Sequence, residues 1–238
     1  MEKASLFSSR ERRQRILSCF RASKAAMYIP DHFNESDIEV LQQLIVQHPF
    51  GALVTNGKSG LDANHIPFEL ATDQGHLGTL QAHVARANPV WGDVADNDEV
   101  MVIFNAGDAY ISPTWYPSKQ EHHKQVPTWN YVVIHGHGRI RIRDDKKFVR
   151  GVVARLTRTH EAHEPKPWKM GDAPFDYLEA QLDAIVGLEV EITQLVGKRK
   201  LGQHKAARDI RGPAEMLTAR GNEQIGNAML ACAARKFD

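Results

Sequence analysis

The chain has 238 residues, of which 42% are hydrophobic and 25% charged, an ordinary composition for a globular protein large enough to bury a core. With 30 basic and 29 acidic side chains the formal net charge is +1, so no overall field draws the chain to nucleic acid or to an anionic membrane. Only Cys19 and Cys232 occur, and no stretch approaches the roughly 20 apolar residues that span a bilayer. We therefore predict a soluble, unexported, cytoplasmic protein without a disulfide framework and without a membrane partner.

The chain begins with a basic leader that contains "SSRERRQRILSCFRASK". Charged termini are usually solvated, so we expect residues 1–26 to form a disordered extension, with an amphipathic arm that contacts phosphates as the alternative. The stretch "NESDIEVLQQLIVQHP" then predicts a helix, because Ser36 and Glu39 form a capping box ahead of apolar residues at helical spacing.

Several short strands follow this helix. "FGALVT" and "LDANHIPFEL", joined by the turn "NGKSG", predict a hairpin. Its second strand holds Pro67 and so lies at an edge or is bulged, and "HLGTLQAHV" predicts a further strand. "EVMVIFN" and "AYIS" predict another hairpin around "AGD". Tyr131 to Arg143 predicts a long strand with a solvated face that carries Arg139, Arg141 and Arg143.

Helical periodicity returns at "DDKKFVRGVVARLTRTHE" and "DAPFDYLEAQLDAI", and "VGLEVEITQLVGK" predicts a last strand. Pro213 suits the first turn of a helix, and a closing helix runs through Ile225, Met229 and Leu230. Hairpins flanked by helices indicate an α+β domain built around a small barrel. A parallel doubly wound sheet is disfavoured, because the early strands lack intervening helices.

One candidate group of binding residues lies in "QAHVARANPVW", where a strand ends. His83, Arg86 and Asn88 precede Trp91, and a guanidinium at a rigid strand end is suited to a phosphate dianion. An ordinary surface arginine is the alternative interpretation of Arg86.

A second candidate group lies between Tyr110 and Gly138, in "YISPTWYPSKQEHHKQVPTWNYVVIHGHG". A flat conjugated ring needs an aromatic slot, and its polar edge needs a few donors. The slot is predicted from Trp115, Trp129 and Tyr131, and the donors to a phosphate from Ser112, Lys119 and Thr128. Packing of the rings in a core or a dimer interface is the alternative.

Twelve histidines raise the possibility of a metal site, but their spacing argues against one. His122 and His123 are adjacent and diverge on most backbones, whereas His135 and His137 share a strand face without an obvious third ligand. We therefore predict no metal. "GHGRI" is not a phosphate-binding loop, and no Ser-His-Asp or Cys-His pattern stands out.

Several of these sequence motifs occur together in a known protein family. The chain resembles the PaiB family of FMN-binding negative transcriptional regulators over residues 27–200, in the words "MYIPDHF", "HVARANPVW", "YISPTWYPSK", "VPTWNY", "IHGHG", "THE", "PW" and "DAIVGLEVEI". The resemblance implies an α+β flavoprotein fold, an FMN-binding split β-barrel (antiparallel, Greek-key-like) with flanking helices. It also implies a homodimer with FMN at the subunit interface. Residues 201–238 are then a C-terminal helical segment packed on the barrel domain of residues 27–200.

The resemblance also implies which residues bind FMN, because their positions in this sequence match positions in the family's sequence motifs. These are His83, Arg86, Asn88, Ser112, Trp115, Lys119, Thr128, Trp129 and Asn130. Lys119 would reach either the phosphate or the pyrimidine edge of the ring, where negative charge develops on reduction. The chain departs from the expected "KLSQNR" in reading "KLGQHKAARD", so a ligand contact from Gly202 or His204 is in doubt.

Two classes of function remain open. The first is an FMN-binding regulator of the PaiB type that acts indirectly on transcription, since no basic recognition helix is visible and DNA binding, although possible, is not supported by the sequence. The second is an FMN-dependent oxidoreductase, similar to flavin reductases or pyridoxamine-phosphate oxidases. No residue compels catalysis, so no catalytic residue is assigned, and a simple interaction module is a third interpretation.

Overall fold

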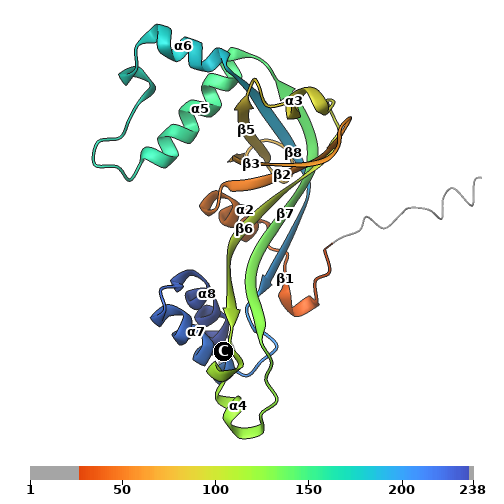
Figure 1. The fold of residues 1–238 in the computed structure, drawn as a ribbon, viewed down its shortest axis with the longest axis vertical. Coiled ribbons are helices and arrows are strands. Elements are labelled where there is room, and N and C mark those ends of the chain that lie inside the picture. Colours follow the sequence, from red (N-terminus) through yellow and green to blue (C-terminus); the bar gives the residue numbers. More distant parts are fainter. Residues whose placement is uncertain (1–26, 236–238) are drawn as a thin grey trace, which may run out of the picture.

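The structure, a computed structural model, describes residues 27–235. Figure 1 shows a long ribbon of strands with helices gathered at both of its ends. The strands are β1 (Asn34–Glu35), β2 (Phe50–Gly57), β3 (Gly60–Pro67), β4 (Glu69–Ala71), β5 (Thr79–Ala85), β6 (Glu99–Ile111), β7 (Thr128–Arg143) and β8 (Ile185–Lys200). The helices are η1 (Asp31–Phe33), α2 (Ile38–Gln47), α3 (Val90–Asp93), η2 (Pro113–Trp115), α4 (Pro117–His122), α5 (Lys146–Glu161), η3 (Met170–Asp172), α6 (Phe175–Asp183), α7 (Ala207–Ala219) and α8 (Glu223–Ala234).

All strands belong to one antiparallel eight-stranded sheet. Its order is β3-β2-β6-β7-β8-β5-β4, and β1 pairs with the far end of β8. The sheet curls until β3 approaches β5, where Asn88 Nδ2, just after β5, donates to Asn64 Oδ1 on β3 at 2.8 Å. The expected α+β fold with an antiparallel barrel is confirmed, and so is the edge position of β3.

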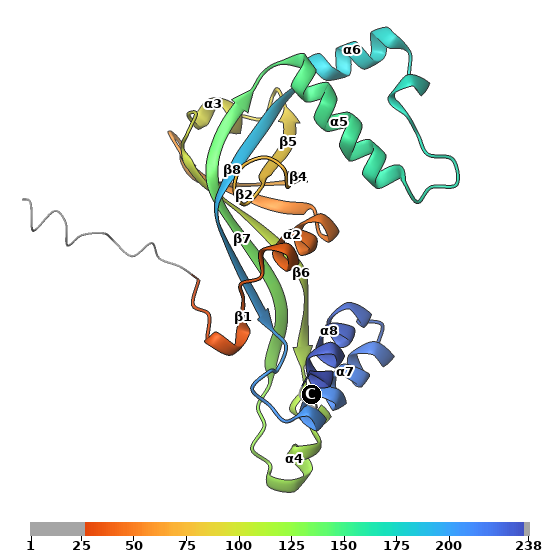
Figure 2. The ribbon, with the colours of Figure 1, turned by 180° about the vertical axis from the view of Figure 1, so that it is seen from behind.

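Three long strands extend well beyond the barrel. The ladder between β7 and β8 runs from Tyr131 opposite Lys200 to Arg143 opposite Gly187, and β6 pairs along the other edge of β7. Seen from both sides, α3, α5 and α6 lie at the Arg143 end of this ribbon, while α4, α7 and α8 lie at the Thr128 end (Figures 1 and 2). Each end therefore carries its own set of helices and loops.

The predicted hairpin around "AGD" is wrong, because β6 is one continuous strand. Its register against β7 shifts by one residue between Asn105 and Asp108, so the extra residue forms a β-bulge instead of a turn. Gly107 has φ +102°, which a glycine adopts without strain, and its N–H donates to Asn105 Oδ1 at 3.0 Å. The turn-like composition of this stretch thus encodes a bend in a long strand.

Two helix starts also differ from the prediction. The N-cap of α2 is Asp37, whose Oδ1 accepts from the N–H groups of Glu39 and Val40 at 3.0 and 3.3 Å, so the predicted capping box with Ser36 is wrong. A carboxylate at this position also interacts favourably with the helix dipole. Pro213 lies inside α7 and not in its first turn, because the helix already begins at Ala207. Pro213 is buried there together with Ile210, Ala214 and Leu217.

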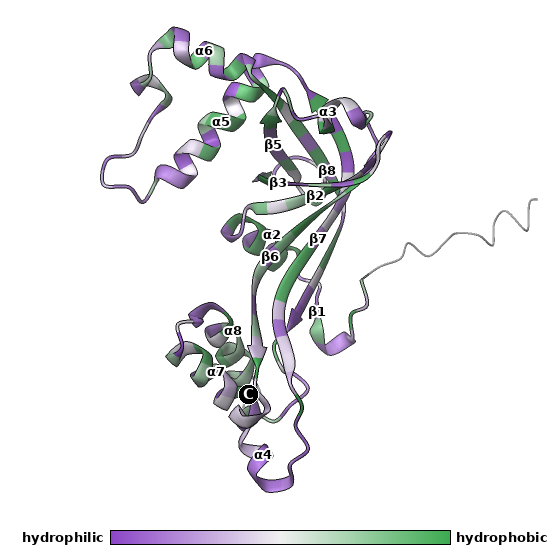
Figure 3. Cartoon of the chain, in the orientation of Figure 1, coloured by the Kyte–Doolittle hydropathy of each residue, from purple (hydrophilic) through white to green (hydrophobic). Residues whose placement is uncertain are grey.

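Strand alternation and helix α2 build the core. The inward residues of the long strands are fully buried, as in Phe104, Ile134 and Leu188, and Leu41 of α2 packs among them. Figure 3 shows hydrophobic residues along β6 and β7 and hydrophilic ones on α4 and on the loop between α5 and α6. None of the helices within residues 27–235 is long and apolar enough to cross a membrane.

The contact between α2 and β8 requires a glycine at position 197. A Cβ there would overlap Leu41 Cδ2 and lie 3.1 Å from the carbonyl oxygen of Glu35. We expect Gly197→Ala to lower the free energy of unfolding by about 1–3 kcal/mol through overpacking, measured by urea denaturation. Gly171→Ala is the control, because its Cβ meets nothing within 4 Å, and it should change stability by less than about 0.5 kcal/mol. Equal losses in the two variants would contradict the contact.

Candidate functional site

The nine candidate residues fall into two groups at opposite ends of the ribbon. The first group lies on and after β5, at the Arg143 end, and consists of His83, Arg86 and Asn88. The second group lies at the Thr128 end, between the end of β6 and the start of β7, and consists of Ser112, Trp115, Lys119, Thr128, Trp129 and Asn130. We call these the β5 group and the β7 group. One chain does not bring the two groups together.

Arg86 is held by contacts within the chain. Its guanidinium pairs bidentately with Asp144, at 2.6 and 2.9 Å, and donates to the carbonyl oxygens of Asp183 and Ile185 at 2.8 and 3.2 Å. The hydrogen bond to Asp144 raises the pKa of Arg86 and lowers that of Asp144. Both side chains are about half exposed, 41% and 47%, so the pair remains open to solvent. The predicted contact of Arg86 with a phosphate stays a prediction, and a ligand there would share the guanidinium with Asp144.

His83 carries a buried nitrogen that lacks a partner. The residue lies on β5 opposite Gly187, and its Nδ1 makes no hydrogen bond within the described part of the chain. Burial lowers the pKa of the imidazole, which favours the neutral ring. Since buried polar atoms are normally paired, this nitrogen is a position where a bound group could supply the missing bond.

Asn88 connects the two edges of the barrel. Its Nδ2 donates to Asn64 Oδ1 at 2.8 Å, and its Oδ1 accepts from the N–H of Val90 at 2.9 Å at the start of α3. Asn64 in turn donates to Asp62 on the same strand. Sequence reasoning missed Asn64, because nothing in a single sequence indicates that β3 lies beside the end of β5.

In the β7 group, the hydroxyls and the lysine lie in the loop after β6. Ser112 Oγ and Thr114 Oγ1 are 2.8 Å apart, and Ser112 caps η2 by accepting from the N–H of Thr114. Within residues 27–235, Lys119 on α4 makes only a long contact of 3.4 Å with His123 Nδ1. Its ammonium group therefore retains donors for an anion.

Lys200 is a member of this neighbourhood that sequence reasoning missed. Its Nζ donates to Thr128 Oγ1 at 2.6 Å and to the carbonyl oxygen of Trp129 at 2.7 Å, and it lies 5.9 Å from the ring centre of Tyr131. On the same face, Lys198 Nζ lies 5.4 Å from that ring. Two ammonium groups thus accompany the aromatic residues at the Thr128 end.

The aromatic residues of the β7 group differ in exposure. Trp129 is 55% exposed and packs edge-on against Tyr110, with ring centres 6.0 Å apart. Trp115 is half-buried, and the guanidinium of Arg220 lies 4.8 Å over its ring. Asn130 is buried and turned inward, where its Nδ2 contacts Met229 Sδ. Trp129 is therefore open to a flat ligand, whereas Asn130 has a structural contact.

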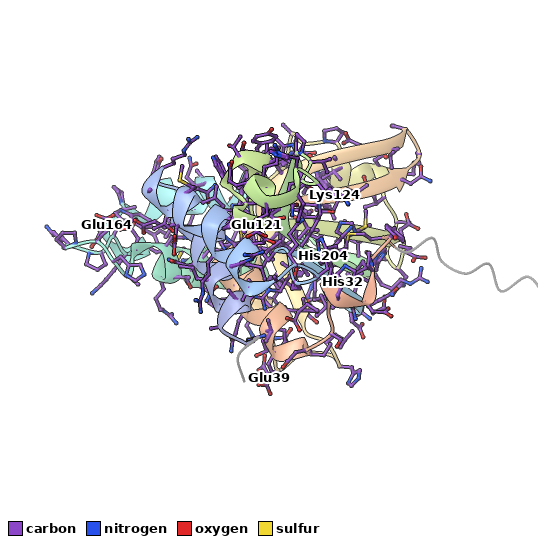
Figure 4. All side chains as sticks on the ribbon, turned by 90° about the horizontal axis from the view of Figure 1, so that it is seen from below. His32, Glu39, Glu121, Lys124, Glu164 and His204 are labelled. Atoms are coloured by element: carbon purple, nitrogen blue, oxygen red, sulfur yellow. The ribbon has the colours of Figure 1, made fainter. Side chains whose placement is uncertain are left out.

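The structure explains locally why Gly202 and His204 differ from the residues that the family's motif has at these positions. Gly202 has φ +87°, a left-handed conformation in which a side chain is strained. The His204 ring lies 5.5 Å from the rings of His32 and Phe33, and Figure 4 shows both histidines on the underside of the molecule. These contacts give His204 a packing role at the segment before α7.

Two further sequence motifs of the family, "THE" and "PW", lie close together in the helical arm formed by α5, η3 and α6. Glu161 Oε2 accepts from the backbone N–H of Trp168 at 2.8 Å, so the "THE" and "PW" words are in contact. They border a hollow of about 440 Å³ that is also lined by Arg158 and Met170. No residue of either candidate group is in its lining.

The outward side of the sheet between the two ends carries a half-buried apolar surface. Paired residues form two cross-strand rows from β2 to β8, which we call the outer rows: Ala52, Ile103, His135 and Val196, and Val54, Met101, His137 and Gln194. Burial, and then the neighbouring His137, lowers the pKa of His135. Helix α2 packs on the opposite side of these strands, as the contact of Leu41 with Gly197 shows. Within residues 27–235 no three His, Cys, Asp or Glu side chains are arranged to hold a metal ion.

Known structures share this architecture. Flavocytochrome Anf3 from Azotobacter vinelandii superposes with a TM-score of 0.53 at 10% identity, over 74% of this chain and 73% of that one. The FAD and heme binding protein from Mycobacterium smegmatis gives 0.51 at 16% identity, over 71% and 74%. At these identities the likeness concerns the fold alone, and the fold is the split barrel of flavoproteins.

Sequence comparison gives the family. Residues 27–194 match the family described as "Putative FMN-binding domain". Uncharacterized protein AN0679 of Emericella nidulans is 34% identical over 218 residues, 77% of this chain and 87% of its own. Protease synthase and sporulation protein PAI 2 of Bacillus subtilis is 28% identical over 202 residues, 85% and 93% of the two chains. The chain belongs to this FMN-binding, PaiB-type family, and the predicted family and cofactor, FMN, are confirmed.

The chemistry of the described residues fits FMN. The unpaired Nδ1 of His83 and the guanidinium of Arg86 are suited to the polar chain and phosphate of the cofactor, and Lys119 and Lys200 offer further cations. The exposed indole of Trp129 is suited to a flat conjugated ring.

Because the pKa of His83 is lowered in the folded state, the free energy of unfolding should depend on pH. The folded state favours the neutral imidazole, so stability should be fully present above the usual histidine value of about 6.5 and should fall as the pH drops below it. In His83→Gln this loss between pH 7 and 5 should be smaller, as measured by urea denaturation at each pH without flavin. The exposed His76 provides the control: His76→Gln should keep the wild-type pH profile. Identical profiles for wild type and His83→Gln would contradict the assignment.

Proposed function

We propose that the protein binds FMN in a site shared between two copies of the chain, the β5 group from one copy and the β7 group from the other. The observation that carries this proposal is the separation of the two groups along the ribbon. Strand β7 begins with Thr128, Trp129 and Asn130 of the β7 group, and its last residue, Arg143, lies opposite Gly187, the partner of His83. The remaining 13 residues of the strand cover roughly 43 Å at about 3.3 Å per residue. FMN, with its phosphate on a short ribityl chain, is much shorter than that distance.

The outer rows support a contact between two copies at the middle of the ribbon. His135 lies halfway along β7, between Thr128 and Arg143. In the proposed dimer the sheets of the two copies face each other, and a two-fold axis passes between them beside His135, perpendicular to β7. This axis reverses the direction of β7 and so places the Thr128 end of one copy beside the Arg143 end of the other. The half-buried apolar residues of the outer rows are of the kind that a homodimer buries, and the lowered pKa of His135 favours a neutral ring that tolerates such burial.

In this arrangement each group has a distinct task. Arg86 and His83 bind the phosphate end of FMN, and Lys119 of the other copy adds a cation there or at the pyrimidine edge of the ring. Trp129 and Trp115 orient the ring and exclude water from one of its faces. The bound cofactor supplies a ring that accepts and donates electrons. The described residues bind and orient, and a regulatory role needs no more than this.

We further propose that regulation of the PaiB type is indirect, through FMN-dependent assembly. The net charge of +1 gives little attraction to DNA, and several arginines on helices α5 and α7 form ion pairs with carboxylates. Arg150 pairs with Glu179, Arg155 with Glu69, and Arg208 with Glu121. The relative from Bacillus subtilis carries the name protease synthase and sporulation protein PAI 2, and a link to sporulation suits a protein that acts on expression.

The first test is FMN binding by the Arg86→Ala variant. Loss of a charge-assisted contact should weaken FMN binding by roughly 1.5–3 kcal/mol, measured by quenching of flavin fluorescence. Asp144→Asn is the matched control, because it removes the competing carboxylate and leaves the guanidinium on its backbone carbonyls, so FMN affinity should stay or rise. Riboflavin, which lacks the phosphate, should bind wild type more weakly than FMN does. Equal FMN titrations for wild type and a folded Arg86→Ala would contradict the phosphate role.

The second test concerns assembly. A ligand that contacts both copies binds the dimer better than the monomer, so saturating FMN must tighten dimerisation. Sedimentation across a dilution series should show this linkage in wild type and its loss in Ile103→Glu, which puts a charge in the outer rows. Lys147→Glu, on exposed α5, should behave as wild type. A monomer at every concentration, or a dimer constant indifferent to FMN, would refute the shared site.

A further inference from the structure

The C-terminal helices α7 and α8 lie outside residues 27–194, the part that matches the FMN-binding family. Helix α7 nevertheless packs against η2 and α4, the segment that carries Trp115 and Lys119 (Figure 1). Seen from below, in Figure 4, α4 with Glu121 lies beside these helices, and Lys124 follows the end of α4. The contact joins a candidate flavin-binding segment to a part of the chain that the family match does not include.

Asp209 of α7 is at the centre of this contact. The residue is buried, with 6% of its surface exposed, and its Oδ1 accepts from the backbone N–H of Ser118 at 3.0 Å. Ser118 is in the first turn of α4, and the N-cap of α4, Tyr116, makes no side-chain cap. A helix of six residues is marginal by itself, so a carboxylate from another helix that binds its free N–H stabilises the first turn.

Asp209 belongs to a polar network that extends from Ser118 to Lys205. Gln125 Nε2 donates to Ser118 Oγ at 2.7 Å, and Lys205 Nζ donates to Gln125 Oε1 at 2.8 Å. The ammonium of Lys205 also lies 4.6 Å from the ring centre of Tyr116. Burial, and then the charge of Asp209, raises the pKa of Tyr116 to about 12, so this ring stays neutral. The network connects the start of α7 with both sides of α4.

Two further contacts fix Trp115 itself. A Cβ added at Gly212 of α7 would lie 2.5 Å from the carbonyl oxygen of Trp115 and 3.0 Å from Pro117 Cδ, so the helix backbone touches this segment directly. At the end of α7, the guanidinium of Arg220 lies 4.8 Å over the indole of Trp115. One helix thus constrains the backbone and the ring of Trp115 as well as the first turn of α4.

We infer that Asp209 is a positioning residue for the FMN site, because it holds α4 so that Lys119 and Trp115 face the cofactor. Asp209 touches no ligand itself and acts through Ser118. The inference rests on the proposed function, since the contacts of Lys119 and Trp115 with FMN are part of that proposal.

The experiment compares Asp209→Ala with Asp209→Asn, which keeps one acceptor oxygen. FMN affinity should fall about tenfold in Asp209→Ala, corresponding to about 1.4 kcal/mol, and should recover in part in Asp209→Asn. The visible circular dichroism of bound flavin should change in Asp209→Ala, because the ring is oriented differently. Val149→Ala, in the buried stripe of α5, is the control for a general loss of stability and should leave both readouts unchanged.

Hydrogen exchange of the flavin-free protein separates this inference from the proposed function. Amides in residues 115–122 should exchange faster in Asp209→Ala and at the wild-type rate in Val149→Ala. Wild type that fails to bind FMN would refute the proposed function, while exchange would still report on α4. Unchanged exchange and FMN affinity in Asp209→Ala, or equal affinity losses in Asp209→Ala and Val149→Ala, would overturn the role of Asp209.

Discussion

The antiparallel ladder between β7 and β8 fixes the distance between the two ends of the molecule. Backbone hydrogen bonds run from the Tyr131–Lys200 pair to the Arg143–Gly187 pair, and β6 stiffens the same ribbon from the other side. A ladder of this kind does not fold back on itself, so side-chain movement cannot bring the β5 group and the β7 group of one chain together. A site that contains both groups therefore requires two copies of the chain.

Different interactions hold the loops at the Arg143 end and at the Thr128 end of the molecule. At the Arg143 end, the bidentate pair of Arg86 and Asp144 ties the turn after β5 to the segment before α5, and Asn88 joins it to β3. At the Thr128 end, the buried carboxylate of Asp209 and the ammonium of Lys200 organise loops that have little regular structure of their own. Each end is therefore preorganised before any ligand arrives, which lowers the entropy cost of binding.

The sequence predicts the local elements well and the long-range contacts poorly. Apolar periodicity and turn residues are sufficient for the β2–β3 hairpin, the long strand β7 and the helix α5, because each depends on near neighbours. The bulge at Gly107 was predicted as a turn, since a glycine with positive φ serves either purpose. Lys200, Asn64 and Asp209 were missed as partners of the candidate residues because the fold brings them there from distant strands and helices. The family's sequence motifs identified the candidate residues, but only the fold reveals that these residues form two separate groups.

A mixing experiment tests the proposed shared site most directly. Arg86→Ala impairs the β5 group and Trp129→Ala the β7 group, and neither variant alone should bind FMN as wild type does. In a dimer that contains one copy of each, one site carries both substitutions and the other carries none. FMN titration after the two variants are mixed and allowed to exchange subunits should therefore recover wild-type affinity in about a quarter of the sites, as expected for random reassortment of a two-fold dimer. No recovery after exchange, with mixed dimers demonstrated by differently tagged copies, would contradict a site built from both chains.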